Sequence, residues 1–313
     1  MTAFIARRIG QALVVLFLVT IIVFGLLHAL PGGLVRAQLG PKASVYAVHQ
    51  LAVQEGLTKP LPVQYLVWLD HAVRGDLGFS YKLNTPVSTL LAEYFPRDLL
   101  LTGLAIALAI AVSIPLGVLQ GYRRNKGVDY VFSGTLLALY SMPSFLLGVI
   151  AIIVLNIELP LLPSTAQEFG HGFGTDAKVL ALPVLTLMLG NIAYYSRYVR
   201  SSVIDNLLED YVRTARAKGA GWSRVLVGHV LRNSLMPVVS LIGISFPYVV
   251  SGSLIVEALF DYPGMGLLFW DAEQSRDYPV LLGVVLLVSV AVVIGSLVAD
   301  VAYAILDPRI RYE

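Results

Sequence analysis

Residues 211–237, YVRTARAKGAGWSRVLVGHVLRNSLMP, decide the fold, because they place two short polar helices between two long apolar runs. Acidic side chains lead into this stretch, beginning at Asp205, and basic ones follow, which suits the dipole of a helix. Gly219 stands where a glycine that ends a helix is expected, and Ser223 is a suitable N-cap for the next helix. The segment 201–234 therefore predicts two amphipathic helices outside the membrane, joined by a glycine turn.

Outward from this segment, six apolar stretches each reach the length of about 20 residues that a helix needs to cross a bilayer. They are Gln11–Leu30, Leu99–Tyr122, Val131–Leu155, Leu180–Val199, Leu235–Leu259 and Leu281–Leu306. They are too long for the strands of a membrane barrel and show no continuous alternation of apolar and polar residues. We expect an all-α, multi-pass membrane protein with six transmembrane helices.

The composition agrees with this class. Of 313 residues, 57% are hydrophobic and 13% are charged, about half of the roughly 25% charged residues that soluble domains carry. The net charge of +2 gives no argument for a nucleic-acid partner. The absence of cysteine excludes a disulfide scaffold and thiolate metal sites, and the five histidines have no ligand spacing, so no metal site is expected.

The distribution of Lys and Arg predicts the orientation. Fourteen of the 22 basic residues lie in four segments, which are 1–10, 123–130, 197–234 and the tail 307–313. The loops 156–179 and 260–280 hold one each, and the loop 31–98 is long enough to cross the membrane regardless of charge. Both termini are therefore expected in the cytoplasm. The run after Arg7 is too long for a signal-peptide core and lacks an A-x-A cleavage pattern, so we expect it to be retained.

The expected organisation has three parts. Residues 1–98 form the first helix and a long extracytoplasmic segment, residues 99–306 form a five-helix core that includes the cytoplasmic loop 201–234, and residues 307–313 form a cytoplasmic tail.

Within the long external segment, Val63, Leu66, Leu69 and Val73 recur at helical spacing and predict one apolar helix face. Tyr65 and Trp68 flank this face, and such rings suit the level of the lipid headgroups. Two compatible interpretations stay open, a helix that lies on the membrane surface and a docking surface for a soluble partner. Tyr65 and Trp68 are the candidate docking residues.

The membrane interior is uncharged, since the central two-thirds of the six runs contain no Asp, Glu, Lys or Arg. Ion-coupled carriers place ionisable residues there, so their absence argues against ion coupling, although carbonyl sites for sodium stay open. Pro115, Pro183 and residues 140–144 are expected to interrupt their helices. The freed carbonyl groups can line a wet cavity, and the hydroxyl and amide groups can form an uncharged pathway or pack helices together. The candidate pathway residues are Tyr140, Ser141, Ser144, Asn191, Tyr194, Tyr195, Ser245, Tyr248 and Ser251.

Common catalytic motifs are missing. The sequence has no Walker A motif, no H-E-x-x-H and no G-x-S-x-G. The chain is therefore expected not to be an enzyme and not to hydrolyse nucleotide itself.

Residues 211–237 resemble the cytoplasmic EAA loop of ATP-binding cassette (ABC) importer permeases, and more narrowly that of the dipeptide/oligopeptide/nickel branch. The pattern keeps Ala215, Gly219 and Leu231, and has Arg213 and Thr214 at the Glu and first Ala positions. Further stretches agree in order along the whole chain: FIARRIGQ (4–11), RGDLGFS (74–80), PVSTLL (86–91), YSMPSFLLG (140–148), VEALFDYPGMG (256–266) and ADVAYAILDPRIRYE (299–313). The chain resembles the first of the two related permease subunits.

The resemblance implies the type I ABC importer permease fold in a prokaryotic plasma membrane. It implies a heterodimer with a sister permease, two cytoplasmic ATPases that bind ATP and Mg²⁺, an extracytoplasmic solute-binding protein, and no cofactor in this chain. The residues expected to contact the ATPases are Arg213, Thr214, Ala215, Arg216, Lys218, Gly219, Trp222 and Arg224. The expected solute is a di- or oligopeptide. The alternatives are a nickel chelate or another small solute, or, in a different class, an ion-coupled carrier or channel that works alone.

Overall fold

The computed structural model describes residues 2–29, 35–36, 39–40, 43–54, 56–235, 238–239, 241–242, 245, 248–249 and 253–306. The predicted tail 307–313 and Ser251 lie outside the described residues. The chain divides into two compact units. Unit 1 comprises Met1–Asp98, Val250–Leu254 and Pro263–Glu313, and unit 2 comprises Leu99–Val249 and Ile255–Tyr262.

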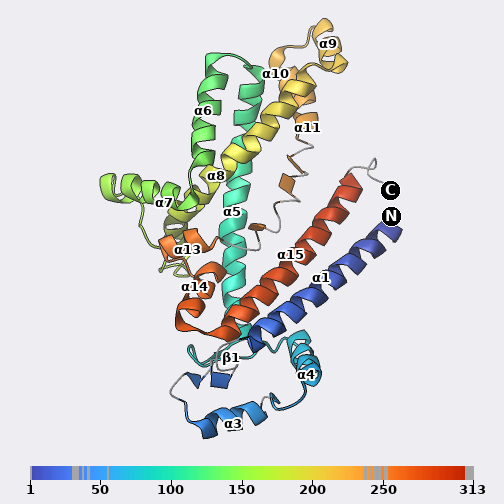
Figure 1. The fold of residues 1–313 in the computed structure, drawn as a ribbon. Helices are drawn as coiled ribbons and strands as arrows, with labels where there is room; N and C mark the ends of the chain where they lie inside the picture. Colours follow the sequence, from blue (N-terminus) through green and yellow to red (C-terminus); the bar gives the residue numbers. More distant parts are fainter. Residues whose placement is uncertain are drawn as a thin grey trace. The chain divides into compact units, whose positions relative to one another are not determined.

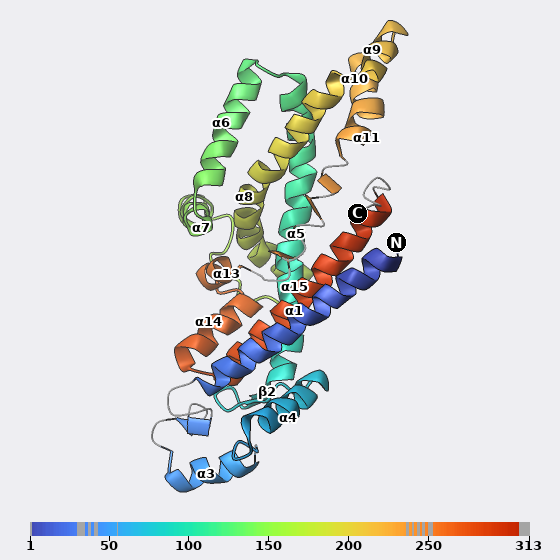
Figure 2. The ribbon, with the colours of Figure 1, turned by 45° about the vertical axis from the view of Figure 1, so that its right-hand side comes forward.

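Unit 1 is built on two long helices that lie side by side, α1 and α15, in Figures 1 and 2. Its elements are α1 (Thr2–His28), α3 (Val45–Gln54), α4 (Leu61–Val73), β1 (Phe79–Ser80), β2 (Thr85–Pro86), the start of α5 (Val87–Tyr122), α14 (Met265–Ser275) and α15 (Tyr278–Leu306). The two strands pair antiparallel, with Ser80 opposite Thr85. The beginning of α1 and the end of α15 lie at the same end of the helix pair (Figure 1).

The core of unit 1 joins the start of α5 to α14 and α15. Val87, Leu91, Leu268 and Val284 are buried in one apolar cluster. A Cβ added to Gly283 would lie 2.5 Å from Val87 Cγ1, so this helix contact requires glycine. Polar groups at its edge are paired, since the buried Ser80 hydroxyl donates to the Asp277 carboxylate.

Unit 2 is a helical bundle around α8, which contacts α6, α7 and α11 (Figure 2). Its elements are the rest of α5, α6 (Gly127–Ser141), α7 (Ser144–Ile152), the π-helical segment η1 (Ile153–Glu158), α8 (Phe173–Leu207), α9 (Asp210–Ala217), α10 (Trp222–Val225), the π-helical segment η2 (Leu226–Val230), α11 (Leu231–Ser234) and α13 (Leu254–Phe260).

Small residues spaced four apart bring α5 against α8. The Ser113 hydroxyl donates to the Ile192 carbonyl over 3.1 Å. A Cβ added to Gly117 would lie 2.6 Å from Val199 Cβ, and one added to Gly121 would lie 2.7 Å from Val203 Cγ1. Because residues four apart share a helix face, the three small residues form one contact surface, as is common where membrane helices pack closely.

Among the residues that the structure describes, four helices are long and apolar enough to cross a membrane, and a fifth is added if one bent pair counts as a single span. The four are Ala6–Leu26, Val87–Tyr122, Phe173–Leu207 and Tyr278–Ala299, and the bent pair is Gly127–Ser141 with Ser144–Glu158, at 104°. Part of the fifth run, Leu235–Leu259, lies outside the described residues. The six-helix prediction therefore stays a prediction, and so does the cytoplasmic position of both termini.

The predicted break in residues 140–144 is confirmed, but the breaks predicted at Pro115 and Pro183 are wrong. Met142 and Pro143 are extended, with ψ of 132° and 143°, because a residue before proline is pushed away from the α region. α5 and α8 instead run through their prolines. One proline removes a single hydrogen bond, and packed neighbours in a membrane bundle can compensate for that loss in a helix of this length.

Candidate functional site

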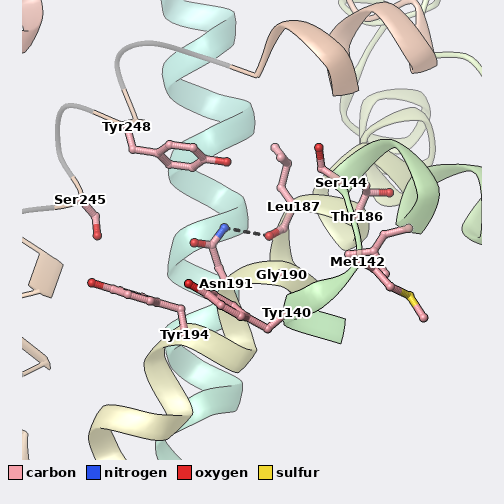
Figure 3. Close-up of a pocket in the computed structure, with 11 residues that line it drawn as sticks. Tyr140, Met142, Ser144, Thr186, Leu187, Gly190, Asn191, Tyr194, Ser245 and Tyr248 are labelled. Carbon is pink, nitrogen blue, oxygen red and sulfur yellow. Dashed lines mark hydrogen bonds between the residues drawn. The ribbon is translucent and has the colours of Figure 1, made fainter. Parts of the chain in front are cut away.

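Unit 2 contains an open cavity of about 400 Å³, drawn in Figure 3. Its lining contains Tyr140, Met142, Ser144, Leu147, Thr186, Leu187, Gly190, Asn191, Tyr194, Ser245 and Tyr248. Six of the nine predicted pathway residues are among them: Tyr140, Ser144, Asn191, Tyr194, Ser245 and Tyr248. The structure therefore brings together residues that come from three separate apolar runs of the sequence.

Three walls position these side chains. The break between α6 and α7 supplies Tyr140 and Ser144 from its two sides, and one face of α8 supplies Asn191 and Tyr194. The third wall carries Ser245 and Tyr248, which approach from the side opposite Ser144 in Figure 3. The proline that ends α6 therefore opens the cavity wall, because it redirects the chain between Tyr140 and Ser144.

Short hydrogen bonds orient the polar groups of the cavity. Asn191 Nδ2 donates to the Leu187 carbonyl over 2.8 Å (Figure 3), which fixes the side-chain amide. The Ser245 hydroxyl donates to the Leu241 carbonyl over 2.8 Å and lies 2.7 Å from the Tyr195 hydroxyl. Tyr195 does not line the cavity, and its fully buried ring supports Ser245 from behind.

The chemistry of the lining is neutral. Hydroxyl, phenol and amide groups alternate with apolar side chains, and none of the described lining residues is charged. A lining of this kind can satisfy the polar groups of a neutral or zwitterionic solute by hydrogen bonds, but its residues offer no counter-charge to a solute of high net charge. The Arg197 guanidinium lies near the cavity, 5.8 Å from the centroid of the Tyr140 ring.

Two predicted pathway residues lie elsewhere, and Ser251 is not described. Ser141 Oγ donates back to the Leu137 carbonyl over 2.9 Å, so its hydroxyl is used within α6. Sequence reasoning missed Thr186, Leu187 and Gly190, although they lie within about two turns of Asn191 and Tyr194 along α8 and helical spacing could have indicated them. Met142 and Leu147 carry no polar group, and nothing in the sequence marked them.

The second candidate site is the pair of short helices α9 and α10. Gly219 follows α9 with φ of +82°, the left-handed conformation that favours glycine, so the predicted role of Gly219 as the helix-ending residue is confirmed. Arg216 Nη1 donates to the Ala220 carbonyl over 2.8 Å, and its guanidinium lies 4.6 Å from the centroid of the Trp222 ring. The Trp222 ring in turn lies 5.4 Å from the ring of Tyr122, at the end of α5. Contacts of Arg216 before the turn and of Trp222 after it therefore stabilise the glycine turn.

The predicted helix limits around this turn need correction. Gly221, with extended backbone, is the N-cap of α10, so Ser223 is not. The preceding break falls at Leu208 and Glu209, so Asp205 belongs to α8 rather than to the first short helix. Glycine is acceptable at an N-cap because water can satisfy the exposed N–H groups there, which is why the serine was a misleading signal.

One face of the short helices is buried and the other is open. Val212, Val225 and Val230 are buried together with Val199 and Val203 of α8. Seven of the eight residues predicted to contact the ATPases are exposed, namely Arg213, Thr214, Arg216, Lys218, Gly219, Trp222 and Arg224, and Ala215 is half-buried. The element thus presents a basic surface while its apolar side is anchored to the end of α8.

The candidate docking residues Tyr65 and Trp68 lie on α4 and face α1. The Tyr65 hydroxyl lies 2.8 Å from Thr20 Oγ1, and the rings of Tyr65 and Trp68 lie 5.3 and 5.8 Å from that of Phe24. Of the predicted apolar face, Val63, Leu66 and Val73 are exposed and Leu69 is half-buried. The aromatic residues therefore hold α4 to α1, and α4 turns an apolar surface outward. The docking role itself stays a prediction.

No metal site is evident in the part of the chain that the structure describes, since it contains no group of three or more His, Asp or Glu side chains that could hold an ion.

Comparison with known proteins identifies the family. Residues 113–312 match the model of the binding-protein-dependent transport system inner membrane component, and residues 1–102 match the model of its N-terminal region. The chain is 40% identical over 316 residues to the oligopeptide transport system permease protein AppB of Bacillus subtilis (strain 168), with all of both chains covered. It is 39% identical over 320 residues to a peptide permease protein of Brucella suis biovar 1, with 99% of each chain covered. It is 35% identical over 313 residues to the glutathione transport system permease protein GsiC of Escherichia coli (strain K12), again over the whole of both chains. The chain therefore belongs to the family of inner-membrane components of binding-protein-dependent transport systems, the permeases of ABC importers.

Proposed function

We propose that this chain is a permease subunit of an ATP-driven importer and forms half of the pathway for di- or oligopeptides that an extracytoplasmic solute-binding protein delivers. The observation that carries the proposal is the neutral cavity whose wall, α8, continues into the exposed glycine-turn element. The middle of α8 can contact a solute, and its C-terminal end anchors the surface on which a cytoplasmic motor can act.

The neutral lining supports a peptide as the solute. Peptides carry amide groups and a zwitterionic backbone, and the phenol, amide and hydroxyl groups of the cavity can bond to both without a fixed charge. The relatives are named as peptide, oligopeptide and glutathione permeases, and all three names refer to peptides. We therefore prefer a peptide to the alternative solute, a nickel chelate or another small molecule, for which the described residues offer no ligand cluster.

The complete assembly of the proposal has a sister permease, two ATP-binding subunits that carry ATP and Mg²⁺, and the solute-binding protein, in a prokaryotic plasma membrane. In this chain, six helices cross the membrane and both termini lie in the cytoplasm. The antiparallel arrangement of α1 and α15, with the start of one beside the end of the other, supports termini on the same side (Figure 1). Arg7 and Arg8, which directly precede the first apolar run, support that side being the cytoplasm, because basic segments favour it.

An ion-coupled carrier is the alternative from another class. Such carriers keep acidic or basic side chains at the solute site, and the described lining of the cavity has no Asp, Glu, Lys, Arg or His. Energy must then arrive from outside the membrane. A push on the short helices that rocks α8 between two states would alter the cavity, provided that nucleotide and solute each distinguish those states.

The proposal is tested by purifying the chain with its partner subunits and reconstituting the complex in vesicles. The solute-binding protein is loaded in turn with a labelled dipeptide, with a nickel chelate and with glutathione. We expect ATP-dependent accumulation of the peptide substrates. Accumulation of the nickel chelate alone would contradict the peptide assignment, and no ATP-dependent accumulation of any solute would contradict the proposal as a whole.

A further inference from the structure

An ion pair between a buried carboxylate and a half-buried guanidinium joins the ends of α6 and α8 that lie away from the cavity. Arg200 Nε donates to Asp129 Oδ1 over 2.7 Å, and Arg200 Nη2 donates to Asp129 Oδ2 over 2.8 Å. Asp129 is 2% exposed. Its carboxylate also accepts the Asn125 backbone N–H over 3.0 Å. A bidentate geometry fixes the orientation of both side chains as well as their distance.

Neighbouring contacts extend this ion pair to a third helix. Ser133, one turn along α6, donates to Asp129 Oδ1 over 3.4 Å and accepts a hydrogen bond of 3.3 Å from Gln120 of α5. A Cβ added to Gly121 of α5 would lie 3.1 Å from the Arg200 carbonyl oxygen, so the backbones of α5 and α8 approach closely here. The ends of three helices are therefore held in one arrangement.

The ion pair lies between the two candidate sites. On α8, Arg200 stands among Val199 and Val203, which are buried against the valines of α9, α10 and η2. In the other direction, Asn191 of the cavity is nine residues away on α8, roughly 14 Å along the axis, and Tyr140 is eleven residues from Asp129 on α6, roughly 16 Å. Two of the helices that carry cavity residues, α6 and α8, are thus fixed to each other beside the anchored short helices.

We propose that the Asp129–Arg200 ion pair is a positioning contact that makes α6 and α8 move together, so that motion received by α9 and α10 reaches two walls of the cavity at once. This inference rests on the proposed function. A flexible contact would let α8 move while α6 and Tyr140 stayed behind, and ATP hydrolysis would then proceed with little transport.

The test is the number of solute molecules taken up per ATP hydrolysed by the reconstituted complex. Arg200→Lys keeps a paired positive charge, so the chain should fold and insert, but it loses the bidentate geometry. We expect at least a threefold fall in solute taken up per ATP. An unchanged ratio would overturn the inference, because a merely structural contact would lower the amount of complex without altering the ratio.

A second variant replaces the ion pair by a covalent link. The chain has no cysteine, so Asp129→Cys with Arg200→Cys introduces the only two thiols of this subunit. We expect the reduced variant to couple poorly, and a reversible crosslinker between the two thiols, applied after assembly, to restore at least half of the normal ratio until a reductant removes it. A bridged variant as inactive as the reduced one would contradict the inference, because α6 and α8 would then have to separate during transport.

The control is Glu93→Gln, which removes an ion pair of 2.8 Å with Arg97 that lies within α5 alone. Its ratio of solute taken up to ATP hydrolysed should equal that of the wild type.

The proposed function and this inference fail in different ways. A wild-type complex without ATP-dependent uptake contradicts the proposed function, whereas normal wild-type uptake with an unchanged ratio in Arg200→Lys contradicts only the inference.

Discussion

Gly219 combines a left-handed backbone with free space around it. Its φ is +82°, and a Cβ added there would meet no atom within 4 Å. Any effect of a substitution must therefore come from the backbone, since an ordinary L-residue in this conformation costs roughly 1–2 kcal/mol. This makes Gly219 a position at which the shape of the turn can be changed without a steric clash.

Gly219→Val should lower ATP-driven uptake at least tenfold while the chain stays inserted in the membrane. The strained valine shifts the turn between α9 and α10 and displaces the basic surface. The measurement is uptake by vesicles with matched amounts of complex. Gly221→Ala is the control, because Gly221 has φ of −69° and open space and should tolerate alanine. Normal uptake by Gly219→Val would contradict a role for this turn.

Tyr195→Phe should weaken the solute site without disturbing the fold. The buried ring stays in place, but the hydrogen bond of 2.7 Å to Ser245 is lost. A hydrogen bond of this kind contributes about 1 kcal/mol, so a several-fold rise in the KM for uptake is expected, with the basal ATP hydrolysis unchanged. The same change at the exposed Tyr130 is the control. An unaltered KM for Tyr195→Phe would show that Ser245 needs no support.

At the scale of elements, the contact of α5 with α8 depends on the size of a few residues. Gly117→Ala places a methyl group 2.6 Å from Val199 Cβ and 2.9 Å from the Ser196 carbonyl oxygen, which is backbone and cannot turn away. Overpacking of this kind costs about 1–3 kcal/mol, so a lower thermal unfolding temperature in detergent is expected. Gly103→Ala in the same helix meets no atom within 4 Å and should unfold like the wild type.

The two faces of α4 have different surroundings, so a crosslinking experiment can test each face separately. Leu66 is 63% exposed, whereas Trp68 packs against Phe24 of α1. A photo-crosslinking residue at Leu66 should capture the solute-binding protein in vesicles that contain it, and one at Trp68 should react within this chain. If the residue at Leu66 captures only lipid, α4 is a membrane-surface helix and the docking prediction is wrong.

How far the sequence could predict these elements depends on the range of the interactions. Gly219 and Pro143 were predictable because their backbone preferences act on adjacent residues. Pro115 and Pro183 were not, because the outcome there depends on packing between helices rather than on the local chain. The Asp129–Arg200 ion pair spans 71 positions and the Tyr195–Ser245 bond spans 50, so the sequence showed two flanking charges and two polar residues without indicating that they meet.

At the scale of the whole molecule, the chain has a solute-sized neutral cavity and an exposed basic surface on α9 and α10. Its sequence contains no nucleotide-binding motif. The distribution of Lys and Arg predicts the orientation of the spans, because cytoplasmic loops carry an excess of basic residues, and that orientation stays a prediction. The cavity itself was predictable only as a set of polar residues, since its volume depends on the break after α6 and on how α8 packs. The central claim is that the energy for transport comes from partner ATPases and passes through the glycine turn.

The most direct measurement of this claim is uptake of a labelled dipeptide by vesicles that contain the whole complex and the loaded binding protein, with proton and sodium gradients collapsed by ionophores. We expect uptake that requires ATP on the side of the membrane that the ATPases face. This uptake should be insensitive to the ionophores and should be lost in the Gly219→Val complex. Uptake that persists without ATP and disappears with the ion gradients would contradict the claim and identify an ion-coupled carrier.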